Sequence, residues 1–250
     1  MLRIVRFACI AAAFAMSLAT PAFAALADAP VTAAPFQLGA ADRAALVAAL
    51  ERAPEHGLAP IPAAALDDAG LASAAVGYAE AMRGGRIAGR FPDLWALRPQ
   101  PYDAAEAFTR AVATGRLQSW LDSLAPPQDG YRALVGALAR YRAIEASGGW
   151  PQLAHGPTLK PGDRDPRVAA LRGRIAVETD VRLDGADATL FDAPLAQLLR
   201  REQARLGVPV TGELDKATLA AFNVPVAARI DAIELNLERW RWLPRTLPAY

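Results

Sequence analysis

Few residues in this sequence could carry out nucleophilic or metal chemistry. The single cysteine, Cys9, lies in an apolar segment near the N-terminus, and the two histidines, His56 and His155, lie in segments rich in glycine and proline. A thiolate nucleophile needs a neighbouring base, and a metal site needs several ligands at a suitable spacing. Neither histidine has such a neighbour in the sequence. We therefore expect both on the surface, and we predict no catalytic residue, metal or other cofactor for this chain.

One carboxylate lies where the pattern calls for an apolar residue. Leu195, Leu198, Leu199 and Leu206 define one face of a helix, and Glu202 lies in the middle of that face. Burying an unpaired carboxylate is costly. We expect Glu202 either to reach the edge of its module or to pair with a nearby arginine. A catalytic role is the alternative, but no second carboxylate is placed to partner it.

The first residues have the pattern of a secretory signal peptide. Two arginines precede an apolar run from Phe7 to Leu18, and a small-x-small motif ends at Ala24. The run is shorter than the ~20 residues that a membrane-spanning helix needs. We expect cleavage between Ala24 and Ala25, which would remove Cys9. The predicted location is the periplasm, with membrane contact only through the signal peptide before its cleavage.

The charge balance argues against a nucleic-acid partner. The signal segment holds two arginines and no acid, so 25 basic and 26 acidic residues remain after cleavage, a net charge of −1. Proteins that bind nucleic acids neutralise phosphates with an excess of lysine and arginine. The many arginines and alanines are better explained as a compositional bias.

Apolar periodicity and turn residues predict an all-α fold. Residues 25 to 40 are rich in alanine and proline and suggest a flexible tether, and residues 91 to 101 suggest a loop. The helices of the first part are expected from Asp42 to before Gly57, from Asp67 or Asp68 to Met82, from Ala104 to Val112 behind an Asp103 N-cap, from Leu117 to Leu124, and around Tyr131 and Tyr141.

A second, smaller group of helices follows. It is expected to contain a helix from Pro166 with Asp165 as its N-cap, a helix from Asp192 or Ala193 to Leu206 followed by Gly207, and a short helix from Leu214 to Phe222. A last helix, Val226 to Trp242, carries its apolar stripe at helical spacing and ends before Pro244.

These segments resemble a known family. The stretches LKPGDRDPRVAALR (from Leu159), LLRREQARLGV (from Leu198) and ATLAAFNVP (from Ala217) resemble the three-helix type of peptidoglycan-binding domain. The stretch RIDAIELNLERWRWLP, from Arg229, resembles the segment that joins this module to the catalytic domain in large periplasmic L,D-transpeptidases. Upstream, YRALVGALARYR and GGWP are similar to the helical scaffold domain of the same enzymes.

The resemblance implies a domain plan. Residues 1–24 would be the signal peptide, 25–40 the tether, 41–155 the helical scaffold domain, 156–224 the peptidoglycan-binding-like domain, and 225–250 a linker helix leading to a catalytic domain that this sequence lacks. The catalytic domain of the family carries a histidine and a cysteine nucleophile. Two positions depart from the family pattern: Glu202 replaces a large apolar residue, and Arg172 replaces a glutamine.

The resemblance also suggests partners and contact residues. Peptidoglycan would lie against Arg201, Gln203 and Arg205, although a solvated charged face explains these arginines and Arg200 equally well. A catalytic transpeptidase domain would dock on Trp240 and Trp242.

Three functional hypotheses remain open. The chain is a non-catalytic cell-wall module, or the front part of an active L,D-transpeptidase whose cysteine is encoded beyond residue 250, or a purely structural helical protein.

Overall fold

The computed structural model describes residues 37–86, 101–179, 181 and 187–246. These residues all belong to one compact unit, residues 36–250. The predicted cleavage site at Ala24 and Ala25, most of the tether and most of the 91–101 loop lie outside the described residues. In the described part every regular element is a helix, with two isolated β-bridges between loops, which confirms the all-α class.

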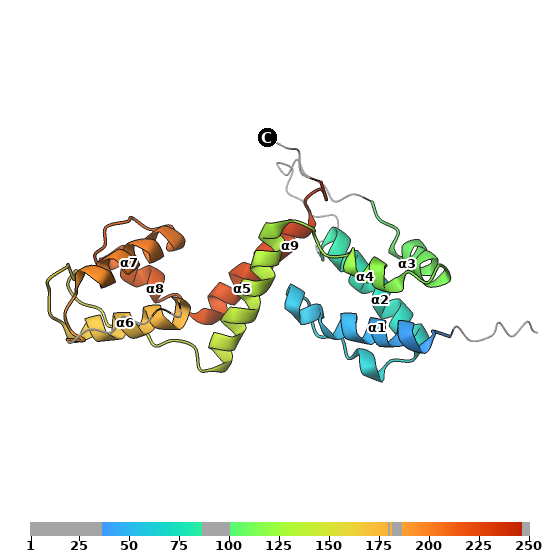
Figure 1. The fold of residues 1–250 in the computed structure, drawn as a ribbon, viewed down its shortest axis with the longest axis horizontal. Helices are drawn as coiled ribbons and strands as arrows, with labels where there is room; N and C mark the ends of the chain where they lie inside the picture. Colours follow the sequence, from blue (N-terminus) through green and yellow to red (C-terminus); the bar gives the residue numbers. More distant parts are fainter. Residues whose placement is uncertain (1–36, 87–100, 180, 182–186, 247–250) are drawn as a thin grey trace, which may run out of the picture. The chain divides into compact units, whose positions relative to one another are not determined.

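The first group of helices comprises the elements up to residue 146 (Figure 1). They are α1 (Ala40–Glu51), the 3-10 turns η1 (Ala53–His56) and η2 (Ala63–Ala65), α2 (Asp68–Gly84), α3 (Ala104–Ala113), α4 (Leu117–Asp122) and α5 (Asp129–Ala146). Capping side chains determine where two of these helices begin. The carboxylate of Asp67 accepts a hydrogen bond from the Gly70 amide, and that of Asp103 accepts one from the Glu106 amide, so both residues act as N-caps.

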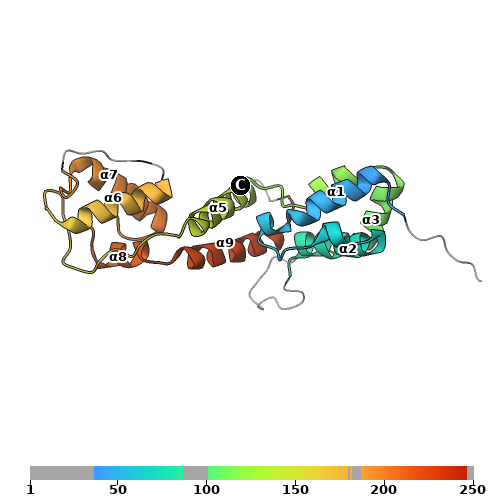
Figure 2. The ribbon, with the colours of Figure 1, turned by 90° about the horizontal axis from the view of Figure 1, so that it is seen from below.

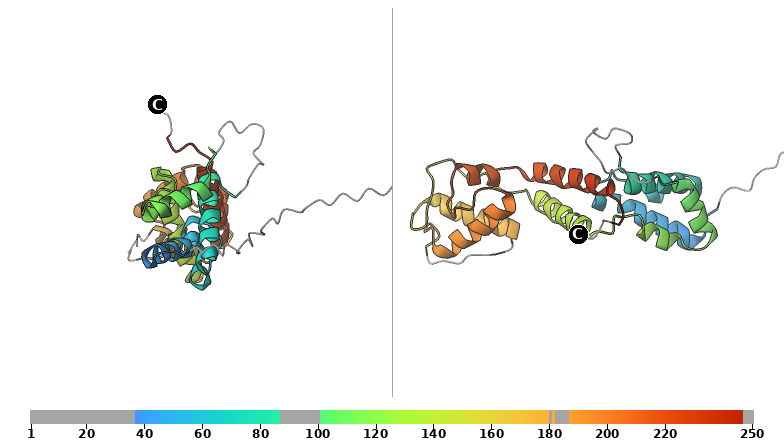
Figure 3. Two further views of the ribbon diagram at one scale, coloured as in Figure 1. Left: turned by 90° about the vertical axis from the view of Figure 1, so that its right-hand side faces the viewer. Right: turned by 90° about the horizontal axis from the view of Figure 1, so that it is seen from above.

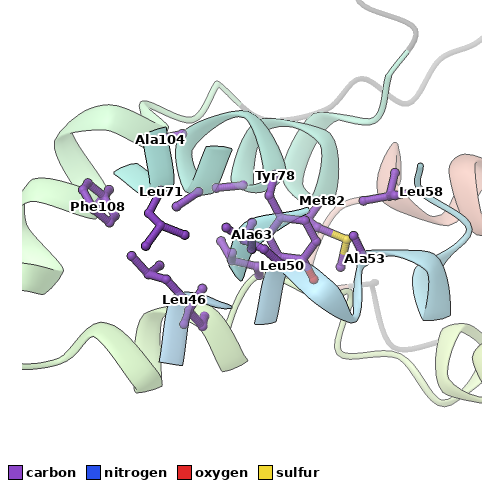
Figure 4. Packing of buried hydrophobic residues seen from close by; sticks show 14 of the residues in the cluster. Leu46, Leu50, Ala53, Leu58, Ala63, Leu71, Tyr78, Met82, Ala104 and Phe108 are labelled. Atoms are coloured by element: carbon purple, nitrogen blue, oxygen red, sulfur yellow. The ribbon is translucent and has the colours of Figure 1, made fainter. Parts of the chain in front are cut away.

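The core of this group joins helices that are distant in the sequence. Leu46 and Leu50 of α1 meet Leu71 of α2, and Phe108 of α3 closes one end of the cluster (Figure 4). Ala63 of η2 is also fully buried in it, so the chain between α1 and α2 stays close to the core. Burial of these apolar side chains is the main stabilising contribution to the group.

The second group, which we call the α6–α8 group, has a separate core. It contains α6 (Pro166–Thr179), α7 (Ala193–Leu206) and α8 (Lys216–Phe222), all visible in Figure 2. Its cluster includes Val168 and Leu171 of α6, Leu199 of α7 and Phe222 of α8. Gly207 ends α7 with φ of 70°, the left-handed conformation that favours glycine at this position.

The last helix, α9 (Val226–Arg241), returns antiparallel to α5, and both lie side by side in Figures 2 and 3. The register is fixed at both ends. The Gln128 amide before α5 donates to the Pro244 carbonyl, and Trp150 after α5 donates to the Val224 carbonyl, 3.1 Å away. Leu237 of α9 belongs to the core of the first group. The segment expected as a linker is therefore a packing element of that group.

Among the described residues, no helix combines the length and the apolar character that crossing a bilayer requires.

The packing of α9 predicts a contrast between two of its leucines. Leu237 is 0% exposed and Leu235 is 46% exposed. Replacing Leu237 by alanine should lower the free energy of unfolding by ~2–5 kcal/mol, the usual cost of emptying a core leucine site. Leu235→Ala should change it by less than ~0.5 kcal/mol. Urea denaturation of the purified chain measures both, and equal effects would show that α9 does not share the core.

Candidate functional site

The residues expected to contact peptidoglycan all lie on α7, but their surroundings differ. Arg201 is exposed, and it makes no ion pair with any residue that the structure describes. Gln203 is fully buried. Arg205 is half-exposed and is held by carboxylates on two helices. Only Arg201 therefore presents a side chain free of partners within the described chain.

The Gln203 side chain organises the turn that follows α7. Its Oε1 accepts a hydrogen bond from the Gly212 amide at 2.8 Å. Its Nε2 donates toward the hydroxyls of Thr211 and Thr218 and the carbonyl of Glu213, at 2.8–3.0 Å. Both ends of the amide are thus used inside the protein, as buried polar groups require. We assign Gln203 to holding the turn, with no part of it left to face a ligand.

Glu202 is buried and paired. Its Oε2 lies 2.6 Å from Nη2 of Arg205, one turn along the same helix. The same guanidinium nitrogen lies 3.1 Å from Oε1 of Glu178, on α6. The sequence expectation that Glu202 pairs with a nearby arginine is confirmed. The apolar face of α7 tolerates the carboxylate because Arg205 neutralises it at the edge of the core.

Arg205 lies at the edge of a cluster between α5 and the α6–α8 group, in which Trp150, Arg174 and Glu178 are buried. We call it the junction cluster: Tyr141, Trp150, Arg174, Glu178 and Arg205. The Tyr141 hydroxyl donates to Glu178 Oε1 at 2.8 Å, and Arg174 donates to Glu178 Oε2 at 2.8 Å. The Arg174 guanidinium lies 3.7 Å from the centre of the Trp150 ring, a cation–π contact. The hydrogen bonds of Tyr141 with Glu178 and Arg205, together with the cation–π contact of Trp150, therefore join the two groups of helices, while the charge pairs of the cluster lie within the α6–α8 group.

The ionisation of Glu178 depends on these partners. Burial alone raises its pKa, but the Arg174 charge, the Tyr141 hydroxyl and the Arg205 charge together outweigh burial. The net pKa lies below the ordinary value. The carboxylate is therefore held ionised, with positive charge on two sides.

The two tryptophans expected to dock a further domain pack within the chain. Trp242 is 7% exposed, and its ring closes on Gly85: a Cβ built there would come within 2.4 Å of the indole nitrogen. Trp240 lies over Gly130, where an added Cβ would come within 2.4 Å of the ring. Trp240 remains partly exposed. Each glycine thus permits the close approach of an aromatic ring. Gly85 and Gly130 are therefore the sequence features that could have indicated this packing.

The histidines differ from each other. His155 is exposed, as expected, but the expectation is wrong for His56, which is half-buried. The His56 ring stacks on Tyr131 with centroids 5.8 Å apart, and its Nδ1 lies 3.0 Å from the Tyr131 hydroxyl. Burial, and then the charge of Arg241, lower the His56 pKa to about 4. The ring is therefore neutral at pH 7 and acts as a packing and hydrogen-bonding group.

Comparison with known proteins bears on the first group of helices. A family model described as a scaffold domain matches residues 34–138, from the segment before α1 to the middle of α5. No curated protein matches the chain. The matched range overlaps residues 41–155, the segment expected as a scaffold domain, and ends inside α5, before the helix meets the junction cluster.

The junction cluster predicts a pH-dependent stability. The pKa of Glu178 is lower in the folded chain than in the unfolded one, so its contribution is complete above about pH 4.5 and is lost as the pH falls through the folded pKa. Glu178→Gln should cost ~3–5 kcal/mol at pH 7, because Arg174 is then left buried without its partner. Denaturant melts at several pH values measure the loss.

The matched control is Glu145→Gln on α5, where the carboxylate is exposed. It should leave stability unchanged within ~0.5 kcal/mol. If Glu178→Gln behaves like this control at pH 7, the buried contacts of Glu178 do not stabilise the folded chain.

From the lowered pKa of His56 we predict that folding stability also changes in a second, separate pH range. Its folded pKa of about 4 lies below its ordinary value of 6.5, so between these values the unfolded chain binds the additional proton. Stability should therefore fall as the pH drops from 6.5 toward 4. His56→Gln should flatten this part of the profile, whereas His155→Gln, at the exposed position, should reproduce the wild-type curve. Thermal melts between pH 4.5 and 7.5 test this, and an unchanged slope in His56→Gln would contradict the assignment.

Proposed function

We propose that this chain is the scaffold and peptidoglycan-binding portion of an L,D-transpeptidase, exported to the periplasm and not catalytic by itself. Two independent results support it. The scaffold-domain match covers the first group of helices as far as residue 138, inside α5. The α6–α8 group, whose sequence resembles a peptidoglycan-binding domain, has its own apolar core.

The strongest support is that the α6–α8 group provides partners for its two unusual residues, Glu202 and Arg172. Glu202 is neutralised by Arg205. Arg172, which is almost buried, pairs with Asp192 at 2.7 Å and donates to the Leu190 carbonyl. Both departures from the family pattern therefore have partners, and the apolar core around Leu199 remains closed. Neither Glu202 nor Arg172 therefore prevents the α6–α8 group from packing as a module.

The proposed binding face is the exposed side of α7 and the turn after it. Gln203 fixes the turn from inside, while Arg201 faces solvent. The Arg200 guanidinium lies against Gly212, where an added Cβ would come within 2.6 Å of it. Arg205 contributes its exposed edge. Peptidoglycan stems carry carboxylates, and arginine binds carboxylates with two parallel hydrogen bonds.

A second candidate, an active L,D-transpeptidase with a cysteine supplied by a further domain, is favoured by one observation. Trp240 packs on Gly130 and is only partly buried. Partly exposed aromatic side chains are common at interfaces. In this proposal the scaffold positions the peptidoglycan strands, and the catalytic domain contacts the end of α9.

Retention on insoluble peptidoglycan sacculi tests the first proposal. The wild-type chain should sediment with the sacculi, and Arg201→Glu should weaken retention by roughly tenfold, the value of one charge-assisted contact. Arg140→Glu is the matched control, because Arg140 is an exposed arginine on α5 without a carboxylate partner among the described residues.

The outcomes are distinct. Free passage of the wild-type chain would contradict the proposal and leave the purely structural hypothesis. Equal losses in both variants would place binding elsewhere than on α7. Turnover of tetrapeptide stems by the purified chain would overturn the statement that it is not catalytic by itself.

A further inference from the structure

A cleft of about 580 Å³ opens in the first group of helices, away from α7. Ligand pockets in proteins usually measure ~300–1,000 Å³. One wall is apolar and comes from the segment after α4 and the first turns of α5: Ala125, Pro126, Pro127, Tyr131 and Val135. The cleft therefore has the size and the apolar surface to hold a short peptide.

Other parts of the cleft lining are positively charged, because they carry arginines. Arg83 of α2 and Arg245 after α9 both line the cleft. The Arg83 guanidinium lies 4.4 Å from the centre of the Tyr102 ring. Arg245 donates to the carbonyls of Ser123, Leu124 and Ala125, which close the end of α4. In the described part of the chain, neither Arg83 nor Arg245 pairs with a carboxylate.

These two positive charges lie on one cleft, and no carboxylate among the described residues pairs with them to neutralise them. Burial, and then the positive charge of Arg83, lower the pKa of Arg245 to about 10. The contacts of Arg245 are neutral carbonyls, which satisfy its N–H groups but not its charge. A bound anion near both guanidinium groups would offset their repulsion.

The remaining charged groups of the cleft do not neutralise Arg83 and Arg245. Arg132 already pairs with Asp129 on its own helix. Asp122, the acid that lines the cleft, accepts a hydrogen bond from Gln118 at 2.8 Å. His56 is neutral at pH 7. Arginines therefore outnumber acids on the lining, and the cleft is complementary to negative charge.

We propose that this cleft, the Arg83–Arg245 cleft, binds short peptides that carry a free carboxylate. The carboxylate lies near Arg83 and Arg245. The apolar side chains of the peptide lie against Pro126, Pro127 and Val135. The apolar wall favours a peptide over inorganic phosphate, which would use the charges alone. This inference does not depend on sacculus binding by α7, since the two sites lie on different helices and are tested with different ligands.

Calorimetric titration of the purified chain with acetyl-tetraalanine and with its C-terminal amide tests the proposal. The acid should bind at least tenfold more tightly than the amide. Arg83→Gln should abolish most of this difference, and Arg83→Lys should retain part of it, because lysine keeps the charge but loses the planar fork. Arg140→Gln, outside the cleft lining, should bind like the wild type.

A gain-of-affinity variant separates binding from folding damage. Asp122→Asn removes the acid of the lining and keeps its shape, so it should tighten binding of the acid severalfold and leave the amide unchanged. Backbone NMR shifts on addition of the acid should centre on residues of the lining such as His56 and Val135.

Several results would overturn the proposal. They are equal binding of acid and amide, no change in Arg83→Gln, NMR shifts centred on α7, or displacement of the peptide by phosphate at an equal concentration. The last outcome would indicate a general anion site.

Discussion

The antiparallel pairing of α5 and α9 is the constraint on which the rest of the structure depends. Leu138 of α5 and Leu237 of α9 are both fully buried in the first core, and Arg142 and Glu234 pair across the two helices at 2.7 Å. The chain leaves the first group at the end of α5 and re-enters it at the start of α9. Everything between them, residues 147 to 225, is consequently an insertion held at both ends.

The contact between the insertion and α5 is polar, in contrast to the apolar cores on either side. Glu178 receives hydrogen bonds from Tyr141 and Arg174, and Arg205 approaches the same carboxylate. Buried ion pairs add little net stability compared with apolar packing, but their directional contacts tolerate few alternative arrangements. The junction cluster is therefore better suited to fixing an orientation than to adding stability. The neighbouring Glu202–Arg205 pair makes the unusual residue of α7 part of this arrangement.

The helices could be predicted closely because their signals are local. Asp103 caps α3 and Gly207 ends α7 as the sequence indicates, and the apolar stripes give most boundaries within a few residues. The pairing of α9 with α5 was missed, because an apolar stripe shows that a helix packs but not on what. His56 was misplaced for the same reason: its partner Tyr131 lies 75 residues away. The role of Gln203 depends on a turn whose geometry no periodicity encodes.

The two-point attachment of the insertion has a mechanical consequence. A pull on the α6–α8 group reaches the first group through two segments at once, the chain after α5 and the chain before α9. Both helices are drawn in the same direction, so the load is shared between them and does not peel one from the other. Because α5 and α9 are antiparallel, the load enters the first group through the C-terminal end of one helix and the N-terminal end of the other. Tension on a protein tethered through this group would therefore reach α5 and α9 together.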